Sequence, residues 1–280
     1  NLKLYLERAR ITELYIDGKK IGRQESLCTP HIYDLNEYIG TGVHEVTICV
    51  SNVGYKTKGG HLTSPDTQTN WNGITGRIEL IGYKNAHAEN VMLWCDIHSK
   101  TVRVTADITG RKSGKAVISA ESFNSEKSHA PEVQSFEYKD GKLDAVYKMG
   151  DDCLLWSEHE PNLYKLRIDI DGDVSEHIIG MREFKTEGGK FTINGEKTFL
   201  RGKHDGMIFP KTAFAPTELD EWLRVMKISK SYGMNHYRYH TCCPPESAFI
   251  AADMVVLNLI TGLLTCISDS LSVCVFHWKI

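Results

Sequence analysis

The 280-residue sequence lacks an excess of positive charge, since 33 Lys and Arg residues stand against 36 Asp and Glu residues for a net charge of -3. A chain of this balance produces no basic field that would concentrate a polyanion. We therefore expect no nucleic-acid partner. The hydrophobic fraction of 41% and the charged fraction of 25% are ordinary for a globular protein and exclude a disordered composition.

The sequence also lacks the short motifs of several common sites. Its eight cysteines form no C-x-x-C pair and no finger-like Cys/His spacing, which favours buried thiols over a zinc site. It has no G-x-G-x-x-G and no phosphate-cradling loop, so we expect no organic cofactor.

Long apolar runs are missing as well. The first residues have no apolar segment with a small-residue cleavage site, and the most apolar run, residues 254–267, is shorter than a span of about 20 residues. We expect no membrane partner. The compartment stays open, a secreted or periplasmic parent protein being one alternative.

What is present in the first three fifths of the chain is alternation with period two, which is typical of half-buried strands. Leu2, Leu4 and Leu6 share one face of such a strand, and residues 46–50 and 102–106 repeat the pattern. Between the runs stand pairs of residues that tolerate the positive φ of tight hairpins. These pairs are Asp17-Gly18, Asp140-Gly141 and Asp171-Gly172.

From about residue 191 the pattern changes. After a hairpin at Asn194-Gly195, the sequence predicts a helix capped by Thr217 and ended by Gly233. A short strand at 235–240, a helix that Pro245 initiates and an apolar strand at 254–260 follow. Strands that alternate with helices indicate a parallel sheet or barrel, so we place domain boundaries near residues 85 and 186.

Four stretches in this order resemble glycoside hydrolase family 2, which includes β-galactosidases, β-glucuronidases and β-mannosidases. The first is "LYLERARITELYIDGKKIG" with "HIYDLNEYIGTGVHEVTICVSN", and the second is "TQTNWNGITGRIEL". The third is "LLWSEHEPNLYKLRIDI", and the fourth is "GMREFKTEGGKFTINGEKTFLRGKHD" with "MKISKSYGMNHYRYHTCCPPE". Together they cover roughly residues 1 to 253.

The resemblance implies a multidomain, mainly β protein. Residues 1–85 would form a partial jelly-roll sugar-binding domain, residues 86–186 an immunoglobulin-like β-sandwich, and residues 187–280 the first β/α units of a (β/α)8 TIM barrel, with an unrecognised tail from about residue 254. A barrel needs about 250 residues and a jelly roll about eight strands. We therefore expect an incomplete barrel and a fragment truncated at both ends.

The candidate site lies in "RGKHD" and in the "RYH" of "NHYRYHTCCPPE", which we place directly after the first two barrel strands. Since functional side chains of a parallel barrel sit at the carboxyl ends of its strands, the two motifs should meet at one rim. Guanidinium and imidazole groups there would offer several donors to sugar hydroxyls. The residues are Arg201, His204, Asp205, Arg238 and His240.

The resemblance adds roles. It implies that Arg238 hydrogen-bonds the nucleophilic carboxylate and keeps it ionised, that His204, Asp205 and His240 line the terminal-sugar subsite, and that a loop with Asn70 approaches the pocket. The chain departs from the family's R-G-x-N-x-H and R-x-S-H-Y-P patterns at both motifs. Individual sugar contacts therefore do not transfer directly.

Several candidates have a structural alternative. Arg201 serves equally well as an ion-pair partner beneath the barrel, and His236 as a core histidine. Trp71 either stacks on a sugar or plugs the jelly roll, Asn70 also suits a turn cap, and Cys242 and Cys243 suit packing better than a vicinal disulfide. A metal pair of His236 and His240 is disfavoured, because Arg238 between them would repel a cation.

The catalytic carboxylates are missing from the expected positions. Retaining glycosidases need two carboxyl groups about 5–5.5 Å apart, and the resemblance implies two glutamates from later barrel strands, one in an Asn-Glu pair. The only Asn-Glu is Asn36-Glu37, in the first β module, and no glutamate follows Glu246. We therefore assign no catalytic or metal-binding residue.

The expected function is that of a fragment of an exo-acting retaining β-glycosidase that hydrolyses terminal β-linked sugars, with carbohydrate as the partner and no turnover by this chain alone. The alternative is a non-catalytic carbohydrate-binding protein built on the two β modules. The oligomeric state stays open at this stage.

Overall fold

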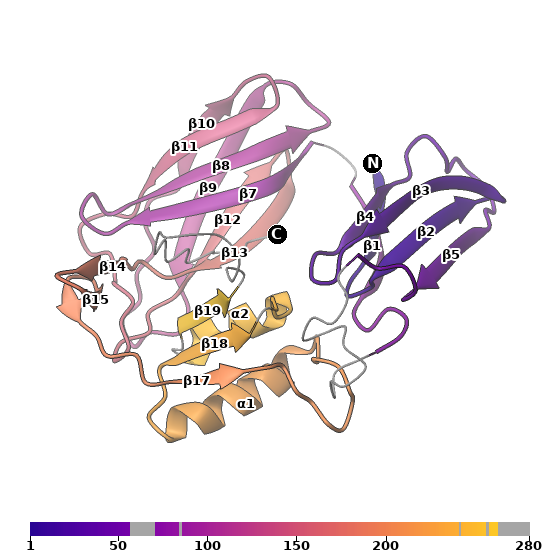
Figure 1. Ribbon diagram of the computed structural model, residues 1–280. Helices are drawn as coiled ribbons and strands as arrows, with labels where there is room; N and C mark the ends of the chain where they lie inside the picture. The colour runs from indigo at the N-terminus through magenta and orange to yellow at the C-terminus, as the bar shows by residue number, and fades with distance from the viewer. Residues whose placement is uncertain (57–70, 84–85, 241, 256–257, 263–280) are drawn as a thin grey trace.

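The computed structural model describes residues 1–56, 71–83, 86–240 and 242–255, and the backbone of 258–262. Two β-sandwiches lie side by side, and a smaller unit of parallel strands with two helices packs beneath them (Figure 1). In the described ranges, none of the helices is both long and apolar enough to cross a membrane.

The first sandwich pairs two antiparallel three-stranded sheets. Leu4 and Leu6 of one sheet and Leu14 and Ile16 of the other are buried in a common core, as the alternation in the sequence predicts. One sheet has the order β4 (His31–Asp34), β1 (Leu2–Leu6), β6 (Ile78–Gly82), and the other β3 (Lys19–Glu25), β2 (Ile11–Ile16), β5 (Val46–Ser51).

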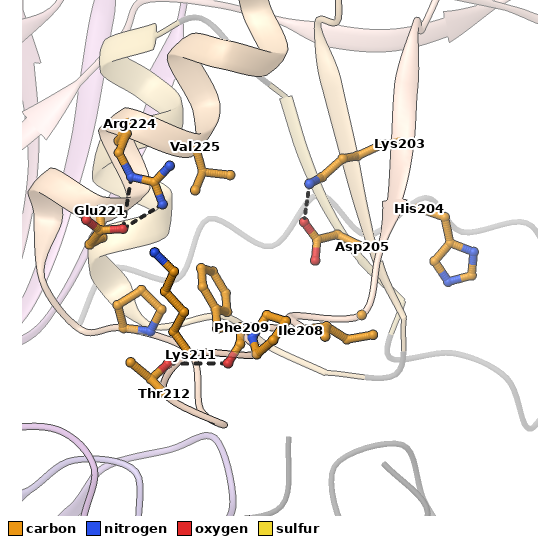
Figure 2. Close-up of a pocket in the computed structure, with 13 residues that line it drawn as sticks. Lys203, His204, Asp205, Ile208, Phe209, Lys211, Thr212, Glu221, Arg224 and Val225 are labelled. Atoms are coloured by element: carbon orange, nitrogen blue, oxygen red, sulfur yellow. Dashed lines mark hydrogen bonds and ion pairs between the residues drawn. The ribbon is translucent and has the colours of Figure 1, made fainter. Parts of the chain in front are cut away.

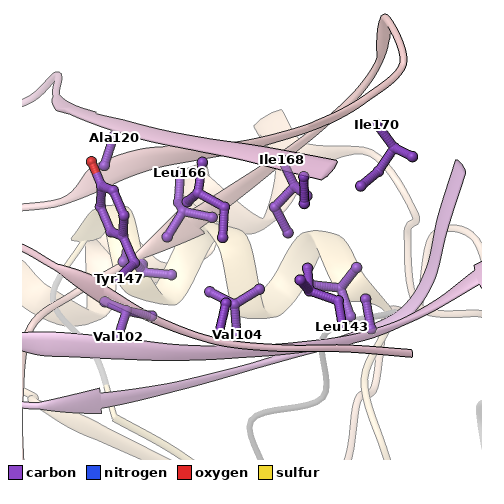
Figure 3. Close-up of a cluster of buried hydrophobic side chains, with 14 of the residues drawn as sticks. Val102, Val104, Ala120, Leu143, Tyr147, Leu166, Ile168 and Ile170 are labelled. Carbon is purple, nitrogen blue, oxygen red and sulfur yellow. The ribbon is translucent and has the colours of Figure 1, made fainter. Parts of the chain in front are cut away.

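Among the described residues, the second sandwich holds the largest hydrophobic core (Figure 3). Val102 and Val104 project from one sheet toward Leu166 and Ile168 of the other, and all four are fully buried. Each such side chain contributes about 1.5–3 kcal/mol on burial. One sheet has the order β10 (Gln134–Tyr138), β9 (Gly114–Ser122), β12 (Tyr164–Ile170), β13 (Asp173–Ile179), and the other β11 (Lys142–Lys148), β8 (Thr101–Thr109), β7 (His87–Asp96).

The predicted hairpin turns are confirmed by their backbone angles. Both residues of each pair have positive φ, for example 53° at Asp171 and 88° at Gly172. This is the geometry that joins two twisted antiparallel strands with a two-residue loop. The same holds for the pairs at 17–18, 140–141 and 194–195.

The C-terminal unit begins with a small antiparallel sheet and continues as strand, helix, strand, helix, strand. The three later strands are parallel, in the order β17-β18-β19, which confirms the predicted alternation. The elements are β14 (Phe184–Glu187), β15 (Lys190–Ile193), β16 (Glu196–Lys197), β17 (Gly202–Asp205), α1 (Leu219–Ser231), β18 (His236–His240), α2 (Glu246–Val255) and β19 (Asn258–Gly262).

Both helices cover the same face of this sheet. Tyr237 and Tyr239 of β18 are fully buried there, in one cluster with Trp222 of α1 and Ala248 of α2. Parallel sheets are normally covered on both faces. The other face of the sheet carries the remaining side chains of β18, which are His236, Arg238 and His240. The candidate site lies on this face.

Two details of the first helix differ from expectation. Thr217 is not the cap, because the helix begins after Glu218 and that position makes no side-chain capping bond. The start of the helix is instead fixed by Trp222, whose side chain is fully buried. Its indole Nε1 also donates a hydrogen bond to the Pro216 carbonyl at 2.7 Å. Gly233, with φ of 77°, ends the helix as predicted.

The first sandwich is joined to the C-terminal unit through a buried arginine. Arg8 is 2% exposed, and its Nη1 donates to the Cys243 carbonyl at 2.9 Å. Its other terminal nitrogen lies 3.8 Å from the sulfur of Met207. Because a buried guanidinium needs partners for its donors, these contacts fix the module against the loop after β18.

Candidate functional site

Three side chains of the predicted site meet on the sheet face away from the helices. His204 and Arg238 are register partners on β17 and β18, and Arg238 Nη1 lies 3.2 Å from His204 Nε2. The rings of His204 and His240 meet edge to face, with centroids 4.8 Å apart. The structure thus brings together one guanidinium and two imidazoles.

The polarity of this trio favours an anionic partner. A guanidinium only donates, so His204 Nε2 is the acceptor in the contact with Arg238. In the described part of the chain, Arg238 has no carboxylate within ion-pair distance. Its remaining donors suit a carboxylate, which accepts two parallel bonds from one guanidinium.

His236 lies on the same face, nearer the amino end of β18. Burial lowers the pKa of His236, and its Nδ1 has no hydrogen-bond partner among the described residues. Its ring packs directly on Gly202 of the neighbouring strand, where a Cβ atom would lie 2.6 Å from the His236 carbonyl oxygen and closer still to the ring. The glycine of "RGKHD" is therefore required for close strand approach.

Asp205 does not join the trio. It projects from the opposite side of β17, where Lys203 Nζ lies 2.9 Å from its Oδ2, while His204 points away from both (Figure 2). Asp205 Oδ1 also accepts a hydrogen bond from the Met207 amide at 2.7 Å. The motif lies within the strand rather than after it, so its successive residues alternate between faces. The predicted single rim is wrong for Asp205.

A cavity of about 1070 Å³ opens between the loop after β17 and helix α1 (Figure 2). Phe209 and Val225 give it apolar walls, while Lys211 and Arg224 bring positive charge. Arg224 is already bound to Glu221, with its Nη2 at 2.8 Å from Oε2. His204, which contacts Arg238, also lines this cavity, so the cavity adjoins the face that carries the trio.

Arg201 lies at the amino end of β17, away from the trio. Its Nε donates to the Gly233 carbonyl at 2.8 Å, and its guanidinium is paired with Glu158 of the second sandwich. Arg201 comes before the first residue of its strand, which explains why it cannot reach the carboxyl-end rim. This placement matches the alternative of a structural ion pair.

No sequence pattern singles out Glu158 as a partner of Arg201. Burial opposes ionisation of Glu158, but the hydrogen bond from Asn235 and the charges of Arg201 and Lys230 outweigh it and hold the pKa of this carboxyl below its usual value. Asn235 Nδ2 donates to Glu158 Oε2 at 3.0 Å. Only the fold brings residues 158, 201 and 235 together.

Trp71 is buried at the junction of the first sandwich and the C-terminal unit. It is 7% exposed and clusters with Met207 and Cys242, and the Arg10 guanidinium lies 5.8 Å from its ring. Trp71 therefore fills the junction rather than the core of the first sandwich and offers no open face to a sugar. Asn70 lies outside the described residues.

The adjacent cysteines are free thiols, and Cys242 packs in the same junction cluster. Burial raises the pKa of Cys242 to about 12 and that of Cys243 to about 11. Both are protonated at neutral pH and suited to packing rather than to metal binding. In the described part of the chain, no group of three His, Cys, Asp or Glu residues is arranged to hold a metal ion.

Sequence comparison finds relatives along most of the chain. The profile of the family described as Glycosyl hydrolases family 2 matches residues 86–182. The β-galactosidase of Halalkalibacterium halodurans is 25% identical over 236 residues, which cover 80% of this chain and 22% of that protein. The β-galactosidase of Thermoanaerobacter pseudethanolicus is 25% identical over 244 residues, or 81% and 32%. The chain thus spans about a fifth to a third of these relatives.

Solved structures share the fold. A glycosyl hydrolase family 2 member from Bacteroides cellulosilyticus superposes with a TM-score of 0.70 at 16% identity, over 92% of this chain and 34% of that one. The β-D-glucuronidase of Dictyoglomus thermophilum superposes with a TM-score of 0.69 at 16% identity, over 93% and 47%. The arrangement of modules in this chain therefore occurs in these larger proteins.

Proposed function

Because the chain belongs to glycosyl hydrolases family 2, we propose that it is part of an exo-acting retaining β-glycosidase that hydrolyses terminal β-linked sugars. Its curated relatives are named mostly as β-galactosidases, one as a putative β-glucuronidase. From these names we take the class of β-glycosidases, with a β-galactosidase-like substrate as the first candidate. The parent protein would act in carbohydrate degradation.

The observation that carries the proposal is the unmatched guanidinium of Arg238. It projects from β18 beside His204 and His240, and no carboxylate of the described residues lies within ion-pair distance of it. In a retaining mechanism one carboxylate attacks the sugar and must stay ionised. An arginine within about 4–6 Å would lower the pKa of that carboxylate by about 1–3 units. We assign Arg238 this positioning role and give His204 and His240 the edge of the sugar subsite.

The C-terminal unit is proposed to be the opening of a (β/α)8 barrel. Among the described strands, β17 pairs with β18 on one edge and with none on the other. Apolar side chains next to β17 and at the end of α1 are exposed. Phe199 before β17 is 77% exposed, and Ile228 and Tyr232 at the end of α1 are 50% and 79% exposed. A further strand and helix packed on this edge would cover all three, as closure of a barrel requires.

The test is the reading frame on both sides of these 280 residues. It should encode an Asn-Glu pair and a second glutamate, each at the end of a predicted barrel strand. With those strands restored, the protein should release nitrophenol from aryl β-glycosides, and Arg238→Ala should lower kcat at least about 100-fold, whereas Arg238→Lys should retain part of the activity. A frame that encodes neither glutamate would refute the proposal.

The chain alone is proposed to be inactive, because it carries Arg238 without the carboxylates that break the bond. The purified chain should release no nitrophenol above a buffer blank from aryl β-galactosides, β-glucuronides or β-mannosides. For the alternative of a non-catalytic carbohydrate-binding protein, Trp71 offers no sugar-stacking surface, since it is buried. Glycan-array binding that survives Arg238→Ala would revive that alternative.

A further inference from the structure

The sequence contains two Asn-Gly pairs, Asn72-Gly73 and Asn194-Gly195. In such a pair the glycine nitrogen can attack the side-chain carbonyl of the asparagine. Glycine has no Cβ to hinder the approach, and its backbone adopts many conformations. The fold holds one of the two pairs in place and leaves the other open to this reaction.

Asn194 is held at both ends of its side-chain amide. Its Oδ1 accepts a hydrogen bond from the Glu183 amide at 2.8 Å, and its Nδ2 donates to the Trp156 carbonyl at 2.9 Å. Its own backbone amide donates to the Glu183 carbonyl at 2.9 Å. Attack by Gly195 would require both side-chain bonds to break and the hairpin turn to open. The fold therefore protects this pair.

Asn72 precedes β6, and its side chain is exposed. Its Oδ1 accepts a hydrogen bond from Asn52 Nδ2, which also donates to the Trp71 carbonyl at 2.8 Å. In the described part of the chain, the Nδ2 of Asn72 makes no hydrogen bond. The nitrogen that must leave is therefore not held, while a donor lies on the oxygen where negative charge develops during the attack.

Gly73 has room to approach the side chain of Asn72. Its φ of 86° lies in the left-handed region that glycine adopts without strain. Apart from the chain neighbours, no described atom lies within 4 Å of the position that a Cβ would take at Gly73. No other described side chain therefore blocks a rotation of the backbone between the two residues.

From this contrast we infer that Asn72 is a site of spontaneous deamidation. The Gly73 nitrogen forms a bond to Asn72 Cγ, the Cγ–Nδ2 bond breaks, and the side-chain nitrogen leaves as ammonia with the proton of the Gly73 amide. Water then opens the five-membered succinimide at either carbonyl, which gives aspartate or isoaspartate. Water is the only co-reactant. The inference goes beyond the proposed glycosidase function and does not depend on it.

The position of Asn72 gives this modification a structural effect. On one side Trp71 is buried in the junction with the C-terminal unit, and on the other the Thr75 amide donates to the Arg8 carbonyl at 3.3 Å. Isoaspartate lengthens the backbone between these two anchors by one methylene group. The connection then cannot keep both contacts as they are, so we expect deamidation to loosen the first sandwich from the C-terminal unit.

Peptide mapping by mass spectrometry, after incubation of the 280-residue chain at mildly alkaline pH, tests the inference. Asn72 should deamidate at least about tenfold faster than Asn194, where two hydrogen bonds must break first. In concentrated guanidinium chloride, which removes these bonds, both asparagines should react at similar rates. Equal rates in the folded chain would overturn the inference. Reaction of Asn72 at least about tenfold more slowly in the folded chain than in guanidinium chloride would overturn it as well.

The effect on the junction is tested on the incubated chain. Molecules with isoaspartate at residue 72 should unfold at a lower guanidinium chloride concentration than the chain before incubation. Asn72→Gln should show neither the modification nor this loss, because a glutamine side chain cannot close a five-membered ring. Freshly purified Asn72→Asp, which carries the charge without the extra methylene group, should unfold as the unaltered chain does. An unchanged unfolding midpoint of the isoaspartate form would refute the effect on the junction.

Discussion

Glu158 of the second sandwich accepts a hydrogen bond from Asn235 Nδ2 at 3.0 Å, across a separation of 77 residues. Asn235 is 1% exposed, and its Oδ1 accepts the Arg201 amide at 2.8 Å. One amide group therefore joins the second sandwich to the amino ends of β17 and β18. This contact therefore fixes the amino ends of the two strands that carry His204 and Arg238.

Replacement of Asn235 by Ala should lower the free energy of unfolding by about 2–3 kcal/mol, because the Arg201 amide and the Glu158 carboxylate both lose a buried partner. Urea unfolding followed by circular dichroism measures the change. Asn36→Ala removes an amide that also makes hydrogen bonds but is exposed, and it should cost less than about 1 kcal/mol. Equal costs at both positions would contradict the assigned role.

Glu158 should make stability fall in acid. Its pKa in the folded chain lies below 4.5, so the unfolded chain takes up the proton first as the pH drops. The contribution of the ionised Glu158 to the free energy of unfolding is fully present above about pH 4.5. It is lost as the pH falls toward the pKa of Glu158 in the folded chain. Glu158→Gln should cost about 1 kcal/mol at pH 7 and remove this part of the acid dependence. Parallel stability curves for both proteins between pH 5 and 3 would argue against it.

His236 should act in a higher pH range. Burial lowers its pKa below 6.5 in the folded chain, so the folded state disfavours the proton that the unfolded state accepts. The neutral His236 therefore lowers the stability of the folded chain at no pH above about 6.5. Below this value the free energy of unfolding declines, because the unfolded chain takes up the proton first. His236→Gln, which does not titrate, should flatten the stability profile between pH 7 and 5. Measurement of unfolding midpoints in urea at half-unit pH steps checks this, with His98→Gln, on the surface, as the control.

Gly202→Ala should destabilise the chain by about 1–3 kcal/mol, because the new methyl group would collide with His236. Gly82→Ala is the matched control, since a Cβ there meets only Leu2 at 3.9 Å, an ordinary contact. The double variant Gly202→Ala with His236→Ala should recover part of the loss but not all, because the His236 carbonyl oxygen stays 2.6 Å away. Full recovery would show that the ring alone causes the collision.

Local patterns predicted much of the fold. Alternating leucines placed β1, the Asp-Gly and Asn-Gly pairs placed the hairpins, and Gly233 placed the end of α1. These features depend on neighbours within a few residues, so one sequence is enough to recognise them. Thr217 failed as a cap because burial of Trp222 and its bond to Pro216 fix where the helix begins.

The site was predicted in part for the same reason. The sequence placed His204, Arg238 and His240 together through the expected pairing of two parallel strands. It misplaced Arg201 and Asp205 because a strand boundary shifted by a few residues moves a side chain to another end or face. The partners Glu158 and Arg8 were beyond reach, since contacts over 43 and 235 residues leave no periodic trace.

The hydrogen bond from Arg8 to the Cys243 carbonyl has a consequence for how the C-terminal unit can evolve or be engineered. The loop after β18 takes its position from a module encoded more than 200 residues upstream. Exchange of the first sandwich for an unrelated one would leave this carbonyl without its donor and let the chain around Cys243 relax. Modules of this chain are therefore exchangeable only in pairs that preserve the Arg8 contact.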